Sequence, residues 1–381
     1  MIRCCSMIAM LLLSASLMAM PIQASDIEMA DMNGRAVTIH QPVENVITAG
    51  YCLLPCIISA LDEEEKIIAT SGAILGGAND TIATIINPKL KDLPNLGSAT
   101  FPVTLNVEAA AALSPDLILL EKDCAGQGDS SVAYEKLIDT LSLLNDEFPS
   151  VSLNNQACSN SPDITLLYKE IELVGKIFDK QQRAAEIIAT LDEEVNLVRN
   201  RTRNISQEEK PKVLFMALQG GLDSSKGAVG SILPDYDCGT LYPNITQISN
   251  AYNGKSRSLM SAEQLLALDP EVIIIVCSRA GFESSKIYNE EYYKGIQDVK
   301  AVREKNVYST GMLEFWRNLA GLEIPIELLI EAKAAYPDRF ADVSVDETLT
   351  DHCRKLYGMN DRQIQELKVN MGLDWMRKSG F

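Results

Sequence analysis

Histidine is almost absent from this chain: only His40 and His352 occur among its 381 residues. A protein site for a bare zinc or manganese ion usually needs several imidazoles that converge on the metal. One histidine near each end of the chain argues against such a site. Haem held by a histidine is disfavoured for the same reason, which leaves tyrosine as the alternative haem ligand. We expect no metal ligands among the side chains.

The common catalytic motifs are also missing. The sequence has no G-x-S-x-G, no P-loop, and no G-x-G-x-x-G that opens a helix after the first strand. The glycine pairs at 76–77 and 220–221 lack the surroundings of those motifs and are interpreted as turns. We therefore expect no catalytic residue, no cofactor and no enzyme activity.

Positive charge is scarce, with 34 Lys and Arg against 52 Asp and Glu, a formal net charge of −18. This much negative charge repels nucleic acid and anionic lipid headgroups, so neither is expected as a partner. After the N-terminal segment there is no apolar run of membrane-spanning length, which argues against direct membrane insertion. We expect a monomer.

The N-terminus has the pattern of a cleavable signal peptide. Arg3 precedes an apolar stretch at 7–20, and small residues end a cleavage site at Ala24. The mature protein is expected to begin near Ser25. Cys4 and Cys5 precede the apolar stretch, whereas a lipid-attachment cysteine would follow it, so we expect no lipid anchor.

Seven cysteines follow the signal segment, and an odd number leaves at least one unpaired even in an oxidising compartment. Cys124 and Cys158 each follow a strand-like run and could form a disulfide; buried free thiols are the alternative. Cys52 and Cys56 lie one helical turn apart, but no second pair or nearby histidine completes a zinc site.

One segment of the chain occurs twice. Residues 106–120, NVEAAAALSPDLILL, reappear at 261–275 as SAEQLLALDPEVIII, with Glu108 aligned to Glu263 and Pro115 to Pro270. Each copy predicts a short acidic-started helix, a proline that stops it, and a buried strand. Two such units suggest two similar lobes; chance similarity of ordinary α/β segments is the alternative.

Helical and strand-like segments alternate along the rest of the chain, which is typical of a parallel α/β sheet. Apolar residues at steps of three and four over 163–204 predict one amphipathic helix long enough to run between the lobes. A solvent-exposed hairpin arm is the alternative. Two or three helices are predicted in the tail, over 318–336, 346–357 and 360–378.

In this order, these segments resemble the periplasmic substrate-binding proteins of ABC importers for iron–siderophore complexes, haem and cobalamin. The resemblance covers nearly the whole chain after the signal segment. It rests on GRAVTIHQPVENVI (34–47), the two E-x-x-x-x-L-x-P-[DE] copies, the long linking helix, VKAVREKNVYS (299–309) and the tail 334–358. No single motif is decisive, and the motifs do not specify a ligand.

The resemblance implies an α/β fold of two Rossmann-like parallel-sheet lobes joined by a single long backbone helix, with a helical C-terminal tail. The expected boundaries are a signal peptide at 1–24, a first lobe at 25–160, the linking helix at 161–205, a second lobe at 206–317 and tail helices at 318–381. It also implies a periplasmic location and an ABC permease as partner. The permease would dock onto Glu108 and Glu263; without the resemblance, each is equally a helix N-terminal acid favoured by the helix dipole.

The ligand is expected in the cleft between the carboxyl ends of the two sheets. The cleft residues should follow the strands, at 49–52, 71–75, 121–124, 218–226, 277–282 and 312–317. Aromatic side chains there could stack on a planar ligand, and cations could neutralise an anionic iron chelate; ordinary packing and solvated surface charge are the alternatives. The candidate ligand-binding residues are Tyr51, Cys52, Lys226, Arg279, Phe282, Trp316 and Arg317.

We expect a ferric siderophore-type chelate as the ligand, with cobalamin and then haem as the competitors. A ligand-sensing protein without transport would use the same cleft, and the sequence does not separate the two roles.

Overall fold

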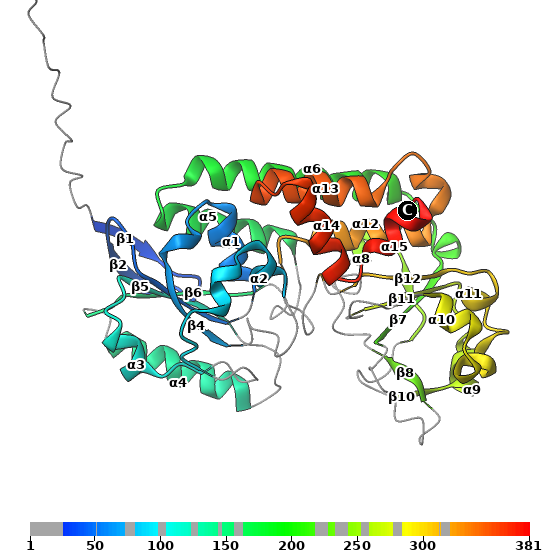
Figure 1. Cartoon of the computed structure of the whole chain (residues 1–381), viewed down its shortest axis with the longest axis horizontal. Helices are drawn as coiled ribbons and strands as arrows, with labels where there is room; N and C mark the ends of the chain where they lie inside the picture. The colour runs from blue at the N-terminus through cyan, green and yellow to red at the C-terminus, as the bar shows by residue number, and fades with distance from the viewer. Residues whose placement is uncertain are drawn as a thin grey trace, which may run out of the picture.

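The computed structural model describes residues 26–50, 52–72, 81–97, 104–122, 129–143, 147–155, 163–217, 228–232, 243–252, 259–276, 284–311, 313 and 321–381. Two α/β lobes lie side by side, and helices on one side of the molecule join them (Figure 1). The fold is therefore the expected α/β fold of two lobes, each with a sheet built around parallel strands, and a helical C-terminal tail.

The N-terminal lobe is built on a four-stranded parallel sheet with the order β4-β3-β5-β6. An antiparallel hairpin, β1–β2, precedes it. The strands are β1 Asp26–Ala30, β2 Ala36–His40, β3 Val46–Gly50, β4 Ile67–Gly72, β5 Leu117–Glu121 and β6 Ser150–Leu153. The helices of this lobe are α1 Leu53–Ala60, α2 Ile82–Ile86, α3 Val107–Ala112 and α4 Asp129–Leu143, with 3₁₀ turns at Glu64–Lys66 and Pro88–Lys91.

The C-terminal lobe has a mixed sheet with the order β10-β8-β7-β11-β12, and β9 also pairs with β7. Strands β7, β11 and β12 are parallel, whereas β8 and β10 run antiparallel. The strands are β7 Lys212–Ala217, β8 Ala228–Ile232, β9 Ser249–Asn250, β10 Leu259–Ser261, β11 Val272–Ile275 and β12 Val307–Ser309. The helices are α8 Pro243–Thr246, α9 Ala262–Leu268, α10 Ser284–Asn289 and α11 Lys300–Arg303, with 3₁₀ turns at Gln207–Glu209 and Glu291–Ile296.

The helical segment between the lobes is two helices, so the prediction of one continuous helix over 163–204 is wrong. Helix α5 Ile164–Ile177 ends, and α6 Gln181–Thr202 turns back and packs against it. Asp179 adopts a left-handed backbone, and the amide of Lys180 bonds to the carbonyl of Gly175 at 2.7 Å, as in a Schellman motif. A Cβ on Gly175 would lie 2.5 Å from Cβ of Ala184, so glycine permits the close approach. The single linking helix is α6.

The tail contains four helices: α12 Ile324–Ala335, α13 Val345–Tyr357, α14 Asp361–Asn370 and α15 Asp374–Ser379, with a 3₁₀ turn at Pro337–Phe340. The helix predicted at 360–378 is therefore two, because Gly372 adopts a φ of +72° between them. A positive φ is costly for most residues and ends a helix readily at glycine.

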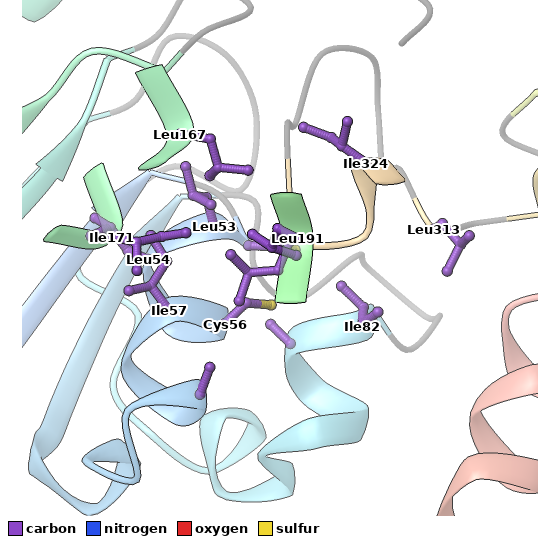
Figure 2. Packing of buried hydrophobic residues seen from close by; sticks show 14 of the residues in the cluster. Leu53, Leu54, Cys56, Ile57, Ile82, Leu167, Ile171, Leu191, Leu313 and Ile324 are labelled. Carbon is purple, nitrogen blue, oxygen red and sulfur yellow. The ribbon is translucent and has the colours of Figure 1, made fainter. Parts of the chain in front are cut away.

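One hydrophobic core runs through both lobes. It includes the N-terminal sheet, the buried faces of α5, α6, α12 and α13, and one face of the C-terminal sheet through Val213, Phe215 and Ile274. Alternate residues of those strands, such as Leu214 and Ile273, enter a second core on the other face, as the pleat of a strand requires. In Figure 2, side chains of α1 pack against α5 and against Leu191 of α6, so the linking helix is anchored in the first lobe.

Candidate functional site

The carboxyl ends of the parallel strands define the candidate ligand site. Strands β3, β4, β5 and β6 point the same way, as do β7, β11 and β12 in the other lobe. Open α/β sheets bind ligands beyond these ends. The predicted residues follow them along the chain, but Tyr51, Lys226, Arg279, Phe282, Trp316 and Arg317 lie outside the described residues.

Cys52 is the one predicted ligand-binding residue that the structure describes. It precedes α1, two residues after β3, and its side chain is buried. Burial raises the pKa of its thiol to about 12, although hydrogen bonds from the Thr81 side chain and the Ala83 backbone oppose the shift. The thiol is therefore neutral at physiological pH, and a contact with ligand would be made by a small apolar group.

Two buried glutamates lie at the carboxyl edge of the N-terminal sheet. Glu121 ends β5, and Glu170 lies on α5; neither side chain is exposed. Asn155 connects them, because its side-chain amide donates to Oε1 of Glu121 at 2.9 Å and its backbone amide donates to Oε1 of Glu170 at 2.6 Å. Burial, and then the nearby charge of Glu121, raise the pKa of Glu170 to about 8. The pair therefore holds a proton at neutral pH.

Gly50 fits this arrangement at the end of β3. A Cβ at this position would overlap Cβ of Glu121 and lie 3.0 Å from its Oε2, and φ is +149°. Position 50 therefore requires glycine, because the Glu121 side chain lies against the end of β3. The sequence placed Glu121 among the strand-end residues but missed Asn155 and Glu170, because nothing along the chain signals that α5 brings its carboxyl group to β5.

The described residues 94–96 and Thr104 bond to the neighbouring strand β4 near its carboxyl end. The Ser71 hydroxyl, near the end of β4, donates to the carbonyl of Thr104. The chain at 94–96 bonds to the backbone of Thr70, through Thr70 N to Pro94 O at 2.9 Å and Leu96 N to Thr70 O at 2.7 Å. Ser71 is thus committed to holding Thr104 against the sheet.

The two repeated units have the same local structure. Glu108 and Glu263 are both the second residue of their helices, α3 and α9, and both are exposed. The N-cap side chains are Asn106, which accepts from Ala109 N at 3.1 Å, and Ser261, which accepts from Gln264 N at 3.3 Å. The Ser261 hydroxyl also bonds to the Glu263 carboxylate at 3.1 Å.

The correspondence continues to the end of each helix. Ser114 and Asp269, which align in the two copies, both have a left-handed backbone immediately before their prolines. In Figure 1, α3 and α9 lie on the side of the molecule opposite to α6, one in each lobe. The repeat therefore gives each lobe one helix with an exposed first-turn glutamate, and the two helices lie on a common side.

Within the described ranges, no group of three or more His, Cys, Asp or Glu side chains could hold a metal ion. Cys52, Cys56 and Cys353 are free and buried. The predicted pair Cys124 and Cys158 lies outside those ranges. No helix in the described part of the chain is long and apolar enough to cross a membrane.

Comparison with known proteins gives consistent matches. Residues 60–312 match the family model described as periplasmic binding protein. The molybdate-binding protein MolA of Haemophilus influenzae is 23% identical over 372 residues, 92% of this chain and 95% of its own length. The ferric-anguibactin-binding protein FatB of Vibrio anguillarum is 24% identical over 261 residues, 66% of this chain and 75% of its own.

Solved structures show the same fold. A periplasmic solute-binding protein from Veillonella parvula superposes with a TM-score of 0.72 at 19% identity, covering 94% of this chain and 100% of its own. The family model spans well over half of the chain, and its members are binding proteins of transporters rather than enzymes. This chain therefore belongs to the periplasmic binding protein family and is the binding component of an ABC importer.

Proposed function

We propose that the protein captures an iron(III)-siderophore-type complex in a cleft between the two sheets and delivers it to the membrane permease. Arg279 and Arg317 follow strands of the second lobe in a chain of net charge −18. Phe282 comes three residues after Arg279, and Trp316 directly precedes Arg317. This pairing of cations with aromatic rings is the observation that carries the proposal, because ferric chelates are commonly both anionic and planar in part. The FatB relative, named for ferric anguibactin, supports it.

A molybdate-type oxyanion is the second candidate. It is favoured because the relative named for molybdate spans 92% of this chain, more than the ferric-chelate relative does. Both ligands are anionic, so the same arginines serve either. The aromatic side chains separate the two: a bulky chelate contacts Phe282 and Trp316, whereas a small oxyanion is enclosed by hydrogen-bond donors.

A thermal-shift screen of the mature protein tests the ligand. The panel contains catecholate and hydroxamate ferric siderophores, the iron-free siderophores, molybdate, sulfate, haem and cobalamin. A ligand at a hundredfold excess over its dissociation constant stabilises the native state by about 2.7 kcal/mol. Stabilisation by a ferric siderophore and not by its iron-free form supports the proposal. Stabilisation by molybdate alone, or by a corrinoid or haem alone, rejects the ferric assignment.

Substitution of the arginines tests the site. Arg317→Ala and Arg279→Ala should weaken binding of the ligand found in the screen, and the loss should be larger at low ionic strength, where charge attraction is least screened. Arg362→Ala is the matched control, because Arg362 is an exposed arginine on α14 that pairs with Glu366. If Arg279→Ala and Arg317→Ala bind the ligand as tightly as Arg362→Ala does, neither arginine belongs to the binding site. Tyr51, Cys52 and Lys226 are the further predicted contacts.

We also propose that Glu108 and Glu263 dock the protein onto the permease. One exposed acid on each repeated helix, both on the side opposite to α6, suits a partner with two basic sockets. The double variant Glu108→Ala/Glu263→Ala should bind ligand normally and fail to support uptake in cells. Glu347→Ala is the control, since Glu347 is also an exposed first-turn acid. Normal uptake by the double variant would contradict the assignment and leave ligand capture unaffected.

The mature protein is proposed to start near Ser25 without a lipid. A related Bacillus subtilis protein is named a lipoprotein, so the N-terminus needs a direct test. Mass spectrometry of the protein from the periplasmic fraction should give an unmodified chain that begins near Ser25. A diacylglyceryl-modified cysteine at the N-terminus would overturn this.

A further inference from the structure

A buried histidine on α13 lies between two carboxyl groups, one from α6 and one from the residue before α12. We call the side chains of Glu194, Glu323, His352 and Tyr357 the seam cluster. Nδ1 of His352 lies 2.9 Å from Oε2 of Glu194, and its Nε2 lies 4.0 Å from Oε1 of Glu323. The Tyr357 hydroxyl donates to the same carboxylate of Glu323. His352 is fully buried, and Glu323 is only 2% exposed.

The seam cluster lies where the elements that join the lobes meet. Glu194 belongs to the linking helix α6, Glu323 precedes α12, and His352 lies on α13, which also contacts α1 of the N-terminal lobe. Near the start of α6, Arg183 donates to the carbonyl of Ala60 in α1 and to the last-turn carbonyls of α13, each at 2.9 Å. Figure 2 shows Leu191 of α6 near the side chains of α1. A change in the cluster therefore acts on the joint between the lobes.

Because two buried carboxyl groups flank the imidazole of His352, the charge balance of the cluster depends on whether the ring is protonated. Burial alone lowers the pKa of His352, but the charges of Glu194 and then Glu323 outweigh burial, so that its pKa lies above the ordinary value. Burial raises the pKa of Glu323, and the His352 charge opposes this. A neutral imidazole would leave Glu194 without its positive partner in a site where an uncompensated charge is costly.

The other titratable groups packed around α13 are neutral thiols or have their own partners. Lys355 of α13 is exposed, faces Glu193 and weakly lowers the pKa of His352. Burial raises the pKa values of Cys56 on α1 and Cys353 on α13. In α14, Lys368 bonds to Asp346 and Thr350, and in α15, Arg377 and Lys378 bond to Asp374. Further along α12, the acids are Glu327 and Glu331.

We propose that protonated His352 is a pH-dependent latch in the joint between the lobes. In the protonated form it ties α13 to α6 and to the start of α12. Loss of the proton as pH rises leaves Glu194 and Glu323 facing each other across a neutral ring, and the contact between α13 and the linking helix loosens. Because any movement of one lobe relative to the other passes through these helices, the pH of the compartment would set how freely the lobes move. This inference does not depend on the ligand.

The sign of the effect follows from proton binding. A folded state with a raised histidine pKa binds more protons than the unfolded chain. The stabilisation by His352 is fully present below the unfolded pKa and is lost as pH rises through the folded pKa. The raised pKa of Glu323 acts in the same direction.

Nuclear magnetic resonance of the imidazole nitrogens tests the proposal on the unmodified protein. The chain has only two histidines, so two sets of signals are expected, and a His40→Gln variant assigns them. His40 is the internal control, because its side chain is 72% exposed. The His352 signals should titrate at higher pH in the folded protein than in the same protein in urea. A midpoint at or below the urea value overturns the latch.

Hydrogen exchange then tests whether the proton acts on the joint. Protection factors of α13, corrected for the chemical exchange rate, should fall between pH 6 and pH 9 relative to those of α4, which is remote from the cluster. In His352→Gln the ring charge is absent at every pH, and the change in α13 protection should shrink to that of α4. If the protection factors of α13 and α4 in the unmodified protein change in parallel with pH, the cluster is only structural and the latch is refuted. This outcome does not depend on whether the variant folds.

Discussion

The buried carboxyl group of Glu170 gives the sharpest quantitative prediction. The change is Glu170→Gln, which keeps an acceptor for the backbone amide of Asn155 and removes the proton that the carboxyl can lose. Burial raises the pKa of Glu170 from 4.5 to about 8. In the unfolded chain this glutamate is ionised throughout the range from pH 6 to pH 9, whereas in the folded protein it holds its proton until pH approaches 8.

The size of the effect follows from linkage. The folded state binds more protons, so its stability falls as pH rises through the folded pKa. With 1.36 kcal/mol for each pKa unit, the Glu170 contribution to the free energy of unfolding falls by about 2–3 kcal/mol between pH 6 and pH 9. The side chain has no solvent exposure, so screening by water does not reduce this contribution. The unmodified protein should therefore lose about 2–3 kcal/mol more than Glu170→Gln over this range.

Urea unfolding followed by circular dichroism at pH 6, 7, 8 and 9 measures the difference. Contributions from His352 and other groups that do not interact with Glu170 are common to both proteins and cancel. Glu172→Gln is the control, because Glu172 is exposed on the same helix. Its free energy of unfolding should change with pH in parallel with that of the unmodified protein. If the free energy of unfolding of Glu170→Gln also changes in parallel with that of the unmodified protein, the Glu170 carboxyl group is not held protonated in the folded state and the reasoning fails.

Four further substitutions follow from the packing and the helix caps. Gly175→Val should lower the free energy of unfolding, measured with urea, by about 1–3 kcal/mol, because the valine side chain would overlap Ala184 across α5 and α6. Gly358→Ala is the control, because Gly358 has open space around it and only its positive φ is disturbed. Arg183→Met should cost about 2–3 kcal/mol in the same assay, since its guanidinium bonds to the last carbonyls of α1 and α13, and an unchanged urea midpoint would count against this account. Asn106→Ala and Ser261→Ala should each lower the free energy of unfolding by about 1 kcal/mol, because each removes an N-cap hydrogen bond. An unchanged thermal unfolding midpoint would contradict this.

The local elements could be predicted from the residues alone, because their signals lie within a few residues of one another. The copies at 106–120 and 261–275 predicted a helix, a stop and a buried strand, and the structure has α3 with β5 and α9 with β11. The repeat predicted two lobes, and alternating strands and helices predicted parallel sheets. The structure has two lobes built around parallel strands, with β8 and β10 antiparallel in the second. Local periodicity also predicted helical structure over 163–204, but it could not show that Asp179 would turn left-handed and reverse the chain.

The set of polar groups that lie together in the interior depends on how distant segments pack against one another. Asn155 follows β6, yet its side chain reaches Glu121 of β5, 34 positions away. Glu194 and His352 are separated by 158 positions and lie 2.9 Å apart. Hydrophobic periodicity carries no information about such pairs, because a buried acid is tolerated only when distant segments supply its partners. The composition showed that histidine is scarce, whereas the packing of α13 against α6 determined that one of the two histidines is buried beside a carboxylate.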